Sequence, residues 1–221
     1  MSKPMQWHGR GPRREFRRPE DDPPGTSRLF VAVPVEDSVR TAVAELMERL
    51  AGEGASIEER APGQPRWVRV AGLHLTLRFL GATPDARQAE LAGAIAEVAI
   101  GASPFRVTLS GGGAFPNEQR PRVLWLAITE GEPELNSLAV RLNEELVRLG
   151  WTPDHRPLQA HLTLARTDGV PGADEAARRL IEAARDLRLS WTPDRLVLYK
   201  SVMGRGPTRY EVVSEGLLAR P

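Results

Sequence analysis

The sequence contains no cysteine and no long apolar run. Without cysteine, the chain has no disulfides, no thiolate metal ligands and no cysteine nucleophile, which fits a reducing cytoplasm. No stretch approaches the roughly 20 apolar residues that a membrane-spanning helix needs. The N-terminus also lacks the apolar segment of a secretory signal. We therefore expect a cytoplasmic protein that does not bind a membrane.

A strong net charge is absent as well. Lys and Arg number 30 and Asp and Glu 29, which gives +1 at pH 7, so the overall charge does not indicate a nucleic-acid-binding protein. Positive charge gathers in the N-terminal "MSKPMQWHGRGPRREFRRPEDDPPG", which is too polar to form a core. We interpret 1–26 as a disordered basic, proline-rich tail, or alternatively as a segment that attracts polyanions such as RNA. Residues 27–221 are expected to form one monomeric, two-lobed domain.

The tetrapeptide HLTL is present twice and holds two of the four histidines, His74 and His161. Around each copy the pattern predicts the same order of elements: strand, helix, HLTL strand, helix, strand. The first strands are expected at 28 and 122, 94 residues apart, and the histidines are 87 residues apart. Offsets this similar predict an internal duplication, and duplicated halves commonly pack about a pseudo-two-fold axis.

Apolar spacing and turn residues predict the individual elements. The expected strands are 28–35, 67–81 with a turn at 71–72, 105–112, 122–128, 158–166, 195–202 and an edge strand within 210–218. The expected helices are 36–51, 83–98, 133–149 and 173–187. Thr83 and Pro84 are expected to begin the second helix as its N-cap and first residue. Together these elements predict an α+β fold of two lobes, with mainly antiparallel sheets flanked by helices around a central cleft.

Strand geometry gives the HLTL repeats a chemical meaning. Alternate residues of a strand share a face, so each histidine points to the same side as the threonine two residues later, Thr76 or Thr163, while the leucines face the core. A pseudo-two-fold axis would bring both His–Thr pairs to one cavity. Near neutral pH one imidazole can act as a general acid and the other as a general base. Threonine hydroxyls can hold the oxygens of a phosphate, so the set suits attack of water on a phosphodiester without a metal.

Other interpretations of these residues have less support. Duplication alone could preserve both motifs without a function. A zinc site needs three or four ligands, and each strand supplies one histidine with no acidic or cysteine ligand nearby. The chain has no G-x-S-x-G motif for a serine nucleophile, and "SGGGAF" lacks the Lys and Ser/Thr of a P-loop. His8 and His155 are interpreted as non-catalytic.

These motifs resemble those of the 2H phosphoesterase superfamily, and most closely its RNA 2',3'-cyclic phosphodiesterases, also called the 2'-5' RNA ligase family. The resemblance covers 28–221 and rests on "RLFVAVP", "LHLTLRFLG", "FPNEQRPRVLWLAI", "AHLTLAR" and "RLVLYKS". It implies metal-free hydrolysis, without a cofactor, of a 2',3'-cyclic phosphate on an RNA end or nucleotide to a 2'-phosphate. It also implies His74 as the proton donor, His161 as the proton acceptor, and Thr76 and Thr163 as phosphate ligands.

The resemblance further implies that Phe79 and Arg166, each five residues after a histidine, sandwich the terminal base. Strict alternation would place both on the face opposite the histidines, so this role requires a bulge, a bend or a strand end. Core packing is the alternative for Phe79. Alternative functions are 2'-5' RNA ligation and its reverse, hydrolysis of another cyclic nucleotide phosphate, or non-catalytic binding of RNA ends.

Overall fold

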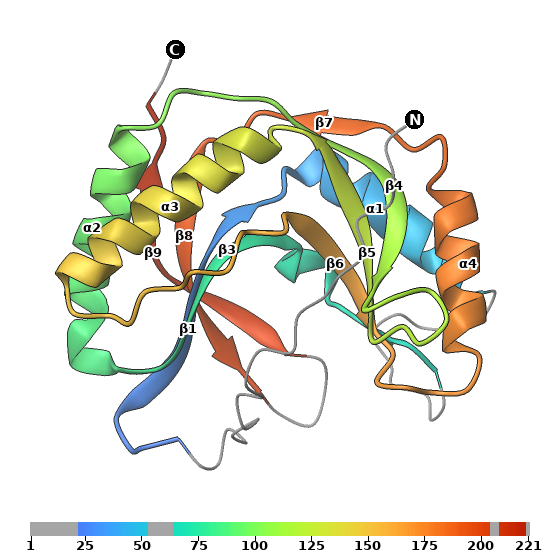
Figure 1. Ribbon diagram of the computed structural model, residues 1–221, viewed down its shortest axis with the longest axis horizontal. Helices are drawn as coiled ribbons and strands as arrows, with labels where there is room; N and C mark the ends of the chain where they lie inside the picture. Colours follow the sequence, from blue (N-terminus) through green and yellow to red (C-terminus); the bar gives the residue numbers. More distant parts are fainter. Residues whose placement is uncertain (1–21, 53–63, 204–207, 220–221) are drawn as a thin grey trace.

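The computed structural model describes residues 22–52, 64–203 and 208–219. Its strands form one sheet in the order β7-β4-β5-β6-β3-β1-β8-β9, with β2 paired to β6, and every pair is antiparallel. The sheet curls, and the helices cover its convex side (Figure 1). The strands are β1 (Thr26–Pro34), β2 (Arg66–Trp67), β3 (His74–Pro84), β4 (Val107–Phe115), β5 (Val123–Glu130), β6 (His161–Arg166), β7 (Leu189–Trp191), β8 (Arg195–Val202) and β9 (Arg209–Leu217). The helices are α1 (Asp37–Ala51), α2 (Gln88–Ile100), α3 (Glu132–Arg148) and α4 (Ala173–Ala183), with 3₁₀ turns η2 (Val70–Gly72) and η3 (Asp85–Arg87).

The strand order is symmetric about the junction between β3 and β6, which confirms the predicted two-lobed α+β fold. The first lobe contains β3, β1, β8 and β9, and the second contains β6, β5, β4 and β7. Helices α2 and α3 pack on the first lobe, and α1 and α4 on the second (Figure 1). The two sequence repeats therefore exchange elements: β4 and α1 come from the first repeat but belong to the second lobe, while β8 and α3 do the reverse.

The amphipathic stripes predicted for the helices are buried against the sheet. In α1 the buried side chains are Val39, Val43, Leu46 and Met47. In α3 they are Leu135, Leu138, Leu142 and Leu146. The helix α3 ends as expected before Gly150, whose φ of 86° is easily adopted by glycine. Burial of these stripes supplies the main force that holds the helices on the sheet.

The predicted start of the second helix at Thr83 and Pro84 is wrong. Both residues belong to β3, where Thr83 pairs with Ser27 of β1. The Thr83 hydroxyl donates a hydrogen bond to the Gly81 carbonyl, 3.2 Å away, instead of capping a helix. The helix begins only at Gln88, after η3. Pairing with β1 therefore outweighs the local helix-start signal. The short strand β7 was missed because its partner β4 is distant in sequence.

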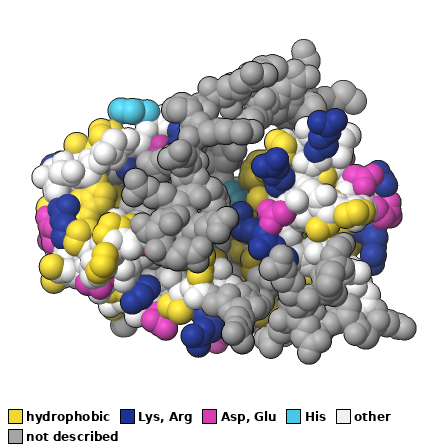
Figure 2. Space-filling view, turned by 90° about the horizontal axis from the view of Figure 1, so that it is seen from below, with side chains coloured by type: hydrophobic (Ala, Val, Ile, Leu, Met, Phe, Trp, Pro, Cys, Tyr) yellow, Lys and Arg dark blue, Asp and Glu magenta, His cyan; other side chains and the backbone are white. Residues whose placement is uncertain are grey.

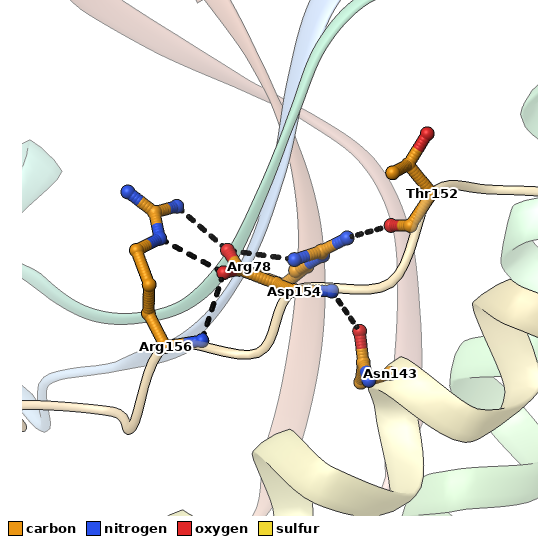
Figure 3. Close-up of polar contacts among 5 residues, drawn as sticks. All are labelled: Arg78, Asn143, Thr152, Asp154 and Arg156. Atoms are coloured by element: carbon orange, nitrogen blue, oxygen red, sulfur yellow. Dashed lines mark hydrogen bonds and ion pairs between the residues drawn. The ribbon is translucent and has the colours of Figure 1, made fainter. Parts of the chain in front are cut away.

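A partly buried ionic cluster fastens β3 to the loop that precedes β6 (Figure 3). Arg78 is 9% exposed, and its Nη1 lies 2.7 Å from Oδ2 of Asp154. Its Nη2 donates a hydrogen bond of 2.6 Å to the Thr152 carbonyl. The backbone amide of Asp154 donates to the Asn143 side chain, and the exposed Arg156 also binds the Asp154 carboxylate. The loop leading to the second HLTL strand is thus anchored to the strand that carries the first.

The expected tail at 1–26 lies mostly outside the described residues. Within the described part, Asp22 forms an ion pair with Arg28, and the Gly25 carbonyl accepts a hydrogen bond from the Asp85 amide. No helix in the described part of the chain has the length and apolar character required to cross a membrane.

Candidate active site

The two HLTL strands meet at the centre of the sheet, where Leu75 of β3 pairs with Leu162 of β6. Both leucines are buried, and the His and Thr residues on either side of each are half-buried. Because the strands are antiparallel, His74 lies toward Thr163 and His161 toward Thr76 across the junction. In the view from below, a histidine side chain lies deep between the two halves of the molecule, beside Lys or Arg side chains (Figure 2). Each strand therefore turns its His–Thr pair toward the same central region.

Each imidazole is held through the same nitrogen. His74 Nδ1 lies 2.6 Å from the Gly72 carbonyl oxygen, and His161 Nδ1 lies 2.7 Å from the Gln159 carbonyl oxygen. A carbonyl can only accept, so both Nδ1 atoms carry a proton. This fixes both rings in the tautomer with Nε2 free to exchange protons, and no described residue binds either Nε2. The backbone carbonyl two residues earlier does the same task in both copies.

The threonines supply hydroxyl donors beside the imidazoles. Thr76 pairs with Ala32 of β1, and Thr163 with Trp125 of β5. Neither hydroxyl makes a hydrogen bond with any of the described residues, and neither is fully buried. Both are therefore available to a bound anion such as a phosphate.

His74 lies among aromatic rings of the first lobe. Its ring centroid is 4.7 Å from that of Phe30, 5.0 Å from that of Tyr210 and 5.9 Å from that of Tyr199. These rings exclude water, and desolvation lowers the pKa of His74 to about 4 in spite of the hydrogen bond to Gly72. The charge of His161, across the junction of β3 and β6, lowers the pKa of His74 further.

His161 lies against Phe115 and Trp125 of the second lobe, at centroid distances of 5.0 and 6.2 Å. Glycine makes room for the indole: a Cβ on Gly113 would lie 2.4 Å from the Trp125 ring. The "SGGGAF" segment, residues 110–115, forms the second half of β4, so the strand expected at 105–112 continues to Phe115. Desolvation is the main cause that lowers the pKa of His161, and the charge of the Arg166 guanidinium lowers it further.

Equivalent bulges bring Phe79 and Arg166 to the histidine side. The β1–β3 register shifts between Thr76 and Arg78, and the β5–β6 register shifts between Thr163 and Ala165. Two consecutive residues are buried at each shift, and the next residue is exposed. Phe79 is 61% exposed, and its ring lies 5.9 Å from that of Phe30, which also contacts His74. The condition that the sequence set for these two residues, a bulge, is met in both strands.

Sequence reasoning missed Tyr210 on the edge strand β9. Its ring meets the His74 ring edge-on at 5.0 Å, and the Arg166 charge acts on its hydroxyl. Burial raises the pKa of Tyr210, so the hydroxyl stays neutral at physiological pH. No motif marks Tyr210 in the sequence, since it reaches the site only through the pairing of β9 with β8. His155 lies exposed on the loop before β6, away from these contacts, and His8 lies outside the described residues.

The described residues contain no group of three or more His, Cys, Asp or Glu side chains arranged to hold a metal ion. Two neutral imidazoles with free Nε2 atoms and two free hydroxyls can instead transfer protons and hold the oxygens of an anion.

A family model and individual related proteins indicate the same family for this chain. Residues 36–205 match the family model of the 2'-5' RNA ligase superfamily. The chain is 32% identical over 197 residues to an RNA 2',3'-cyclic phosphodiesterase of Geobacillus stearothermophilus, covering 88% of this chain and 59% of that protein. It is 37% identical over 139 residues to one of Archaeoglobus fulgidus, covering 63% of this chain and 72% of that protein. A crystal structure of a phosphoesterase superposes with a TM-score of 0.67 at 25% identity, covering 88% of this chain and 99% of that chain.

Proposed function

We propose, from the premise that this chain belongs to the 2'-5' RNA ligase superfamily, that it hydrolyses RNA 2',3'-cyclic phosphate ends to 2'-phosphomonoesters. The observation that carries the proposal is the symmetric pair of imidazoles, each fixed through Nδ1 by a backbone carbonyl and each beside a free threonine hydroxyl. The names of the curated relatives agree with this activity.

The proposed reaction needs one proton acceptor and one proton donor. Nε2 of His161 takes a proton from water as the water oxygen bonds to phosphorus. The bond from phosphorus to the 3'-oxygen breaks, and Nε2 of His74 gives its proton to that oxygen. Thr76 and Thr163 donate hydrogen bonds to the non-bridging oxygens, where negative charge grows in the transition state. Solvent then returns the proton from one imidazole to the other.

The proposed donor must hold a proton that its surroundings disfavour. Desolvation lowers the pKa of His74 to about 4, so burial by itself favours the neutral form. A bound cyclic phosphate is an anion, and an opposite charge within a few ångströms favours the imidazolium. The donor role assigned through the family resemblance therefore requires the substrate to raise the pKa of His74.

Phe79 and Arg166 are proposed to hold the terminal base. Both are exposed, and each follows a bulge at the same distance from its histidine. An aromatic face and a guanidinium plane both stack on any base, so this contact would tolerate all four bases.

The activity is tested directly with the purified protein and adenosine 2',3'-cyclic phosphate in excess EDTA. We expect phosphorus NMR to show conversion to adenosine 2'-phosphate as the sole product. Formation of the 3'-phosphate, or activity that EDTA removes and a divalent metal restores, would contradict the proposed mechanism. Adding an RNA with a free 5'-hydroxyl separates hydrolysis from ligation, because ligation gives a 2'-5' phosphodiester signal.

The pH dependence follows from the lowered pKa values. Turnover requires one protonated and one neutral imidazole, so kcat/KM, which reports the free enzyme, should be bell-shaped. The acidic limb should lie near pH 4 and the basic limb below the usual histidine pKa of 6.5, because both values are lowered. Above pH 6.5 we expect kcat/KM to fall about tenfold per pH unit. The limbs of kcat should lie at higher pH, and a kcat/KM optimum above pH 7 would refute this account.

A further inference from the structure

A cavity of about 200 Å³ opens beside His74, between η2 and the start of β9. Its lining residues are Arg69, Ala71, Gly72, Thr208, Arg209 and Tyr210. A water molecule in the liquid occupies about 30 Å³, so this cavity is several times larger than one water molecule. A phosphate group with its ester oxygens therefore has room here. The proposed two-histidine mechanism does not involve this cavity, and neither does the proposed base-binding role of Phe79 and Arg166.

The cavity shares two walls with the support of His74. The Gly72 carbonyl holds the His74 Nδ1 proton at 2.6 Å, and the Tyr210 ring lies edge-on to the His74 ring. The same ring packs so closely on Gly72 that a Cβ there would lie 2.7 Å from it. Gly72 and Tyr210 therefore contact both the cavity and the His74 ring.

The chemistry of the lining favours an anion. Among the described residues that line the cavity, two are arginines and none is acidic. Among the described residues no carboxylate pairs with the exposed Arg209. Burial raises the pKa of Tyr210, so its neutral hydroxyl can donate a hydrogen bond. Guanidinium groups bind phosphate oxygens in pairs, which suits a phosphodiester.

The neighbours of Tyr210 indicate which phosphate would lie there. Tyr210 contacts His74, and the charge of Arg166 acts on its hydroxyl. A nucleotide with its cyclic phosphate at His74 and its base at Arg166 would thus have the cavity on a third side. The remaining substituent of that nucleotide is the 5'-oxygen, which in RNA carries the preceding phosphodiester.

We propose that this cavity, with Arg209 at its rim, binds the phosphodiester on the 5' side of the terminal nucleotide, so that the enzyme prefers RNA chains to mononucleotides. The proposal rests on the function proposed above. One charge-assisted contact with a phosphate typically changes affinity by about tenfold or more. Binding of a phosphate by arginine releases counterions from the RNA, and this release is less favourable at high salt. The preference for the dinucleotide should therefore shrink at high ionic strength.

The test compares three substrates: adenosine 2',3'-cyclic phosphate, the same compound with a 5'-phosphate, and the dinucleotide ApA with a 2',3'-cyclic phosphate end. We expect kcat/KM to be about tenfold higher for the dinucleotide than for the unphosphorylated mononucleotide. In Arg209→Ala this ratio should fall close to one. In Arg179→Ala, which removes an exposed arginine of α4 in the other lobe, the ratio should stay at its wild-type value.

Equal kcat/KM for the dinucleotide and the unphosphorylated mononucleotide would overturn the proposal, as would a ratio that survives Arg209→Ala. A preference for the 5'-phosphorylated mononucleotide over the dinucleotide would overturn it too, because the cavity would then bind a terminal monoester. If wild-type protein hydrolyses none of the three, the proposed function fails. Calorimetric affinities for adenosine 2'-phosphate and for ApA with a 2'-phosphate end then test the cavity alone, with the same expected ratio and the same two variants.

Discussion

Replacing His161 with alanine is expected to lower kcat for adenosine 2',3'-cyclic phosphate by about 10²–10⁴-fold, the usual range for loss of a general acid or base. His161 is the less enclosed imidazole of the two, so the substitution removes chemistry with little loss of packing. His74→Ala should cost a similar factor. The double variant should be no slower than about tenfold below the worse single variant, because two groups that act in one step are strongly non-additive.

Two further variants separate catalysis from folding. His74 packs among three rings, so His74→Gln, which retains more of the side-chain volume, should be as inactive as His74→Ala while its melting temperature stays closer to wild type. His155→Ala is the matched control, since His155 is an exposed histidine on a loop, and it should retain full activity. Wild-type kcat in a folded His161→Ala variant would refute the two-histidine mechanism.

Replacing Asp154 with alanine is expected to lower the free energy of unfolding by about 2–3 kcal/mol. Arg78 is 9% exposed, and the substitution removes the carboxylate 2.7 Å from its Nη1. Breaking a fully buried pair from one side typically costs about 3–5 kcal/mol. Asp154 is 25% exposed, so water partly replaces the lost contact and the expected value is lower. Urea unfolding followed by circular dichroism measures the change.

Arg156→Ala provides the control for Asp154. Arg156 binds the same carboxylate at 2.6 Å but is 74% exposed, so its loss should cost less than about 1 kcal/mol. Asp154→Asn keeps an acceptor without the charge and should fall between the two. Equal destabilisation by Arg156→Ala and Asp154→Ala would contradict this account, because the buried Arg78–Asp154 pair would then stabilise the protein no more than the exposed Arg156–Asp154 pair.

Much of the fold follows from local pattern, and the rest depends on pairing. The stripes of α1 and α3 are visible in the sequence because helical periodicity is a short-range property. The repeat of HLTL gives the two-lobed layout because similar segments adopt similar structures. The exchange of β4 and β8 between lobes has no local signal, because strand pairing depends on residues distant in sequence. The wrong helix start at Thr83 arose in the same way, since only β1 makes Thr83 part of a strand.

The site shows the same division. His74, Thr76, His161 and Thr163 are placed together by strand alternation and by the pairing of Leu75 with Leu162. The positions of Phe79 and Arg166 required a bulge that alternation alone does not predict, and the structure has one in each strand. Tyr210 could not be predicted from the sequence, because it contacts His74 from β9, the edge strand of the first lobe. Residues brought together by strand alternation and by the repeat are thus predictable, whereas a contact made by the edge strand β9 is not.

The exchange of strands also sets the order in which the chain can finish folding as it leaves the ribosome. Of the strands that the structure describes, β1 is made first, yet one of its two neighbours is β8, which begins at Arg195. Until that strand is synthesised, the apolar β1 has an open edge that a strand of another chain could occupy. The lobe that starts at the N-terminus is therefore the last to close. Contacts this distant in sequence also slow folding, since the long loop must be ordered before they form.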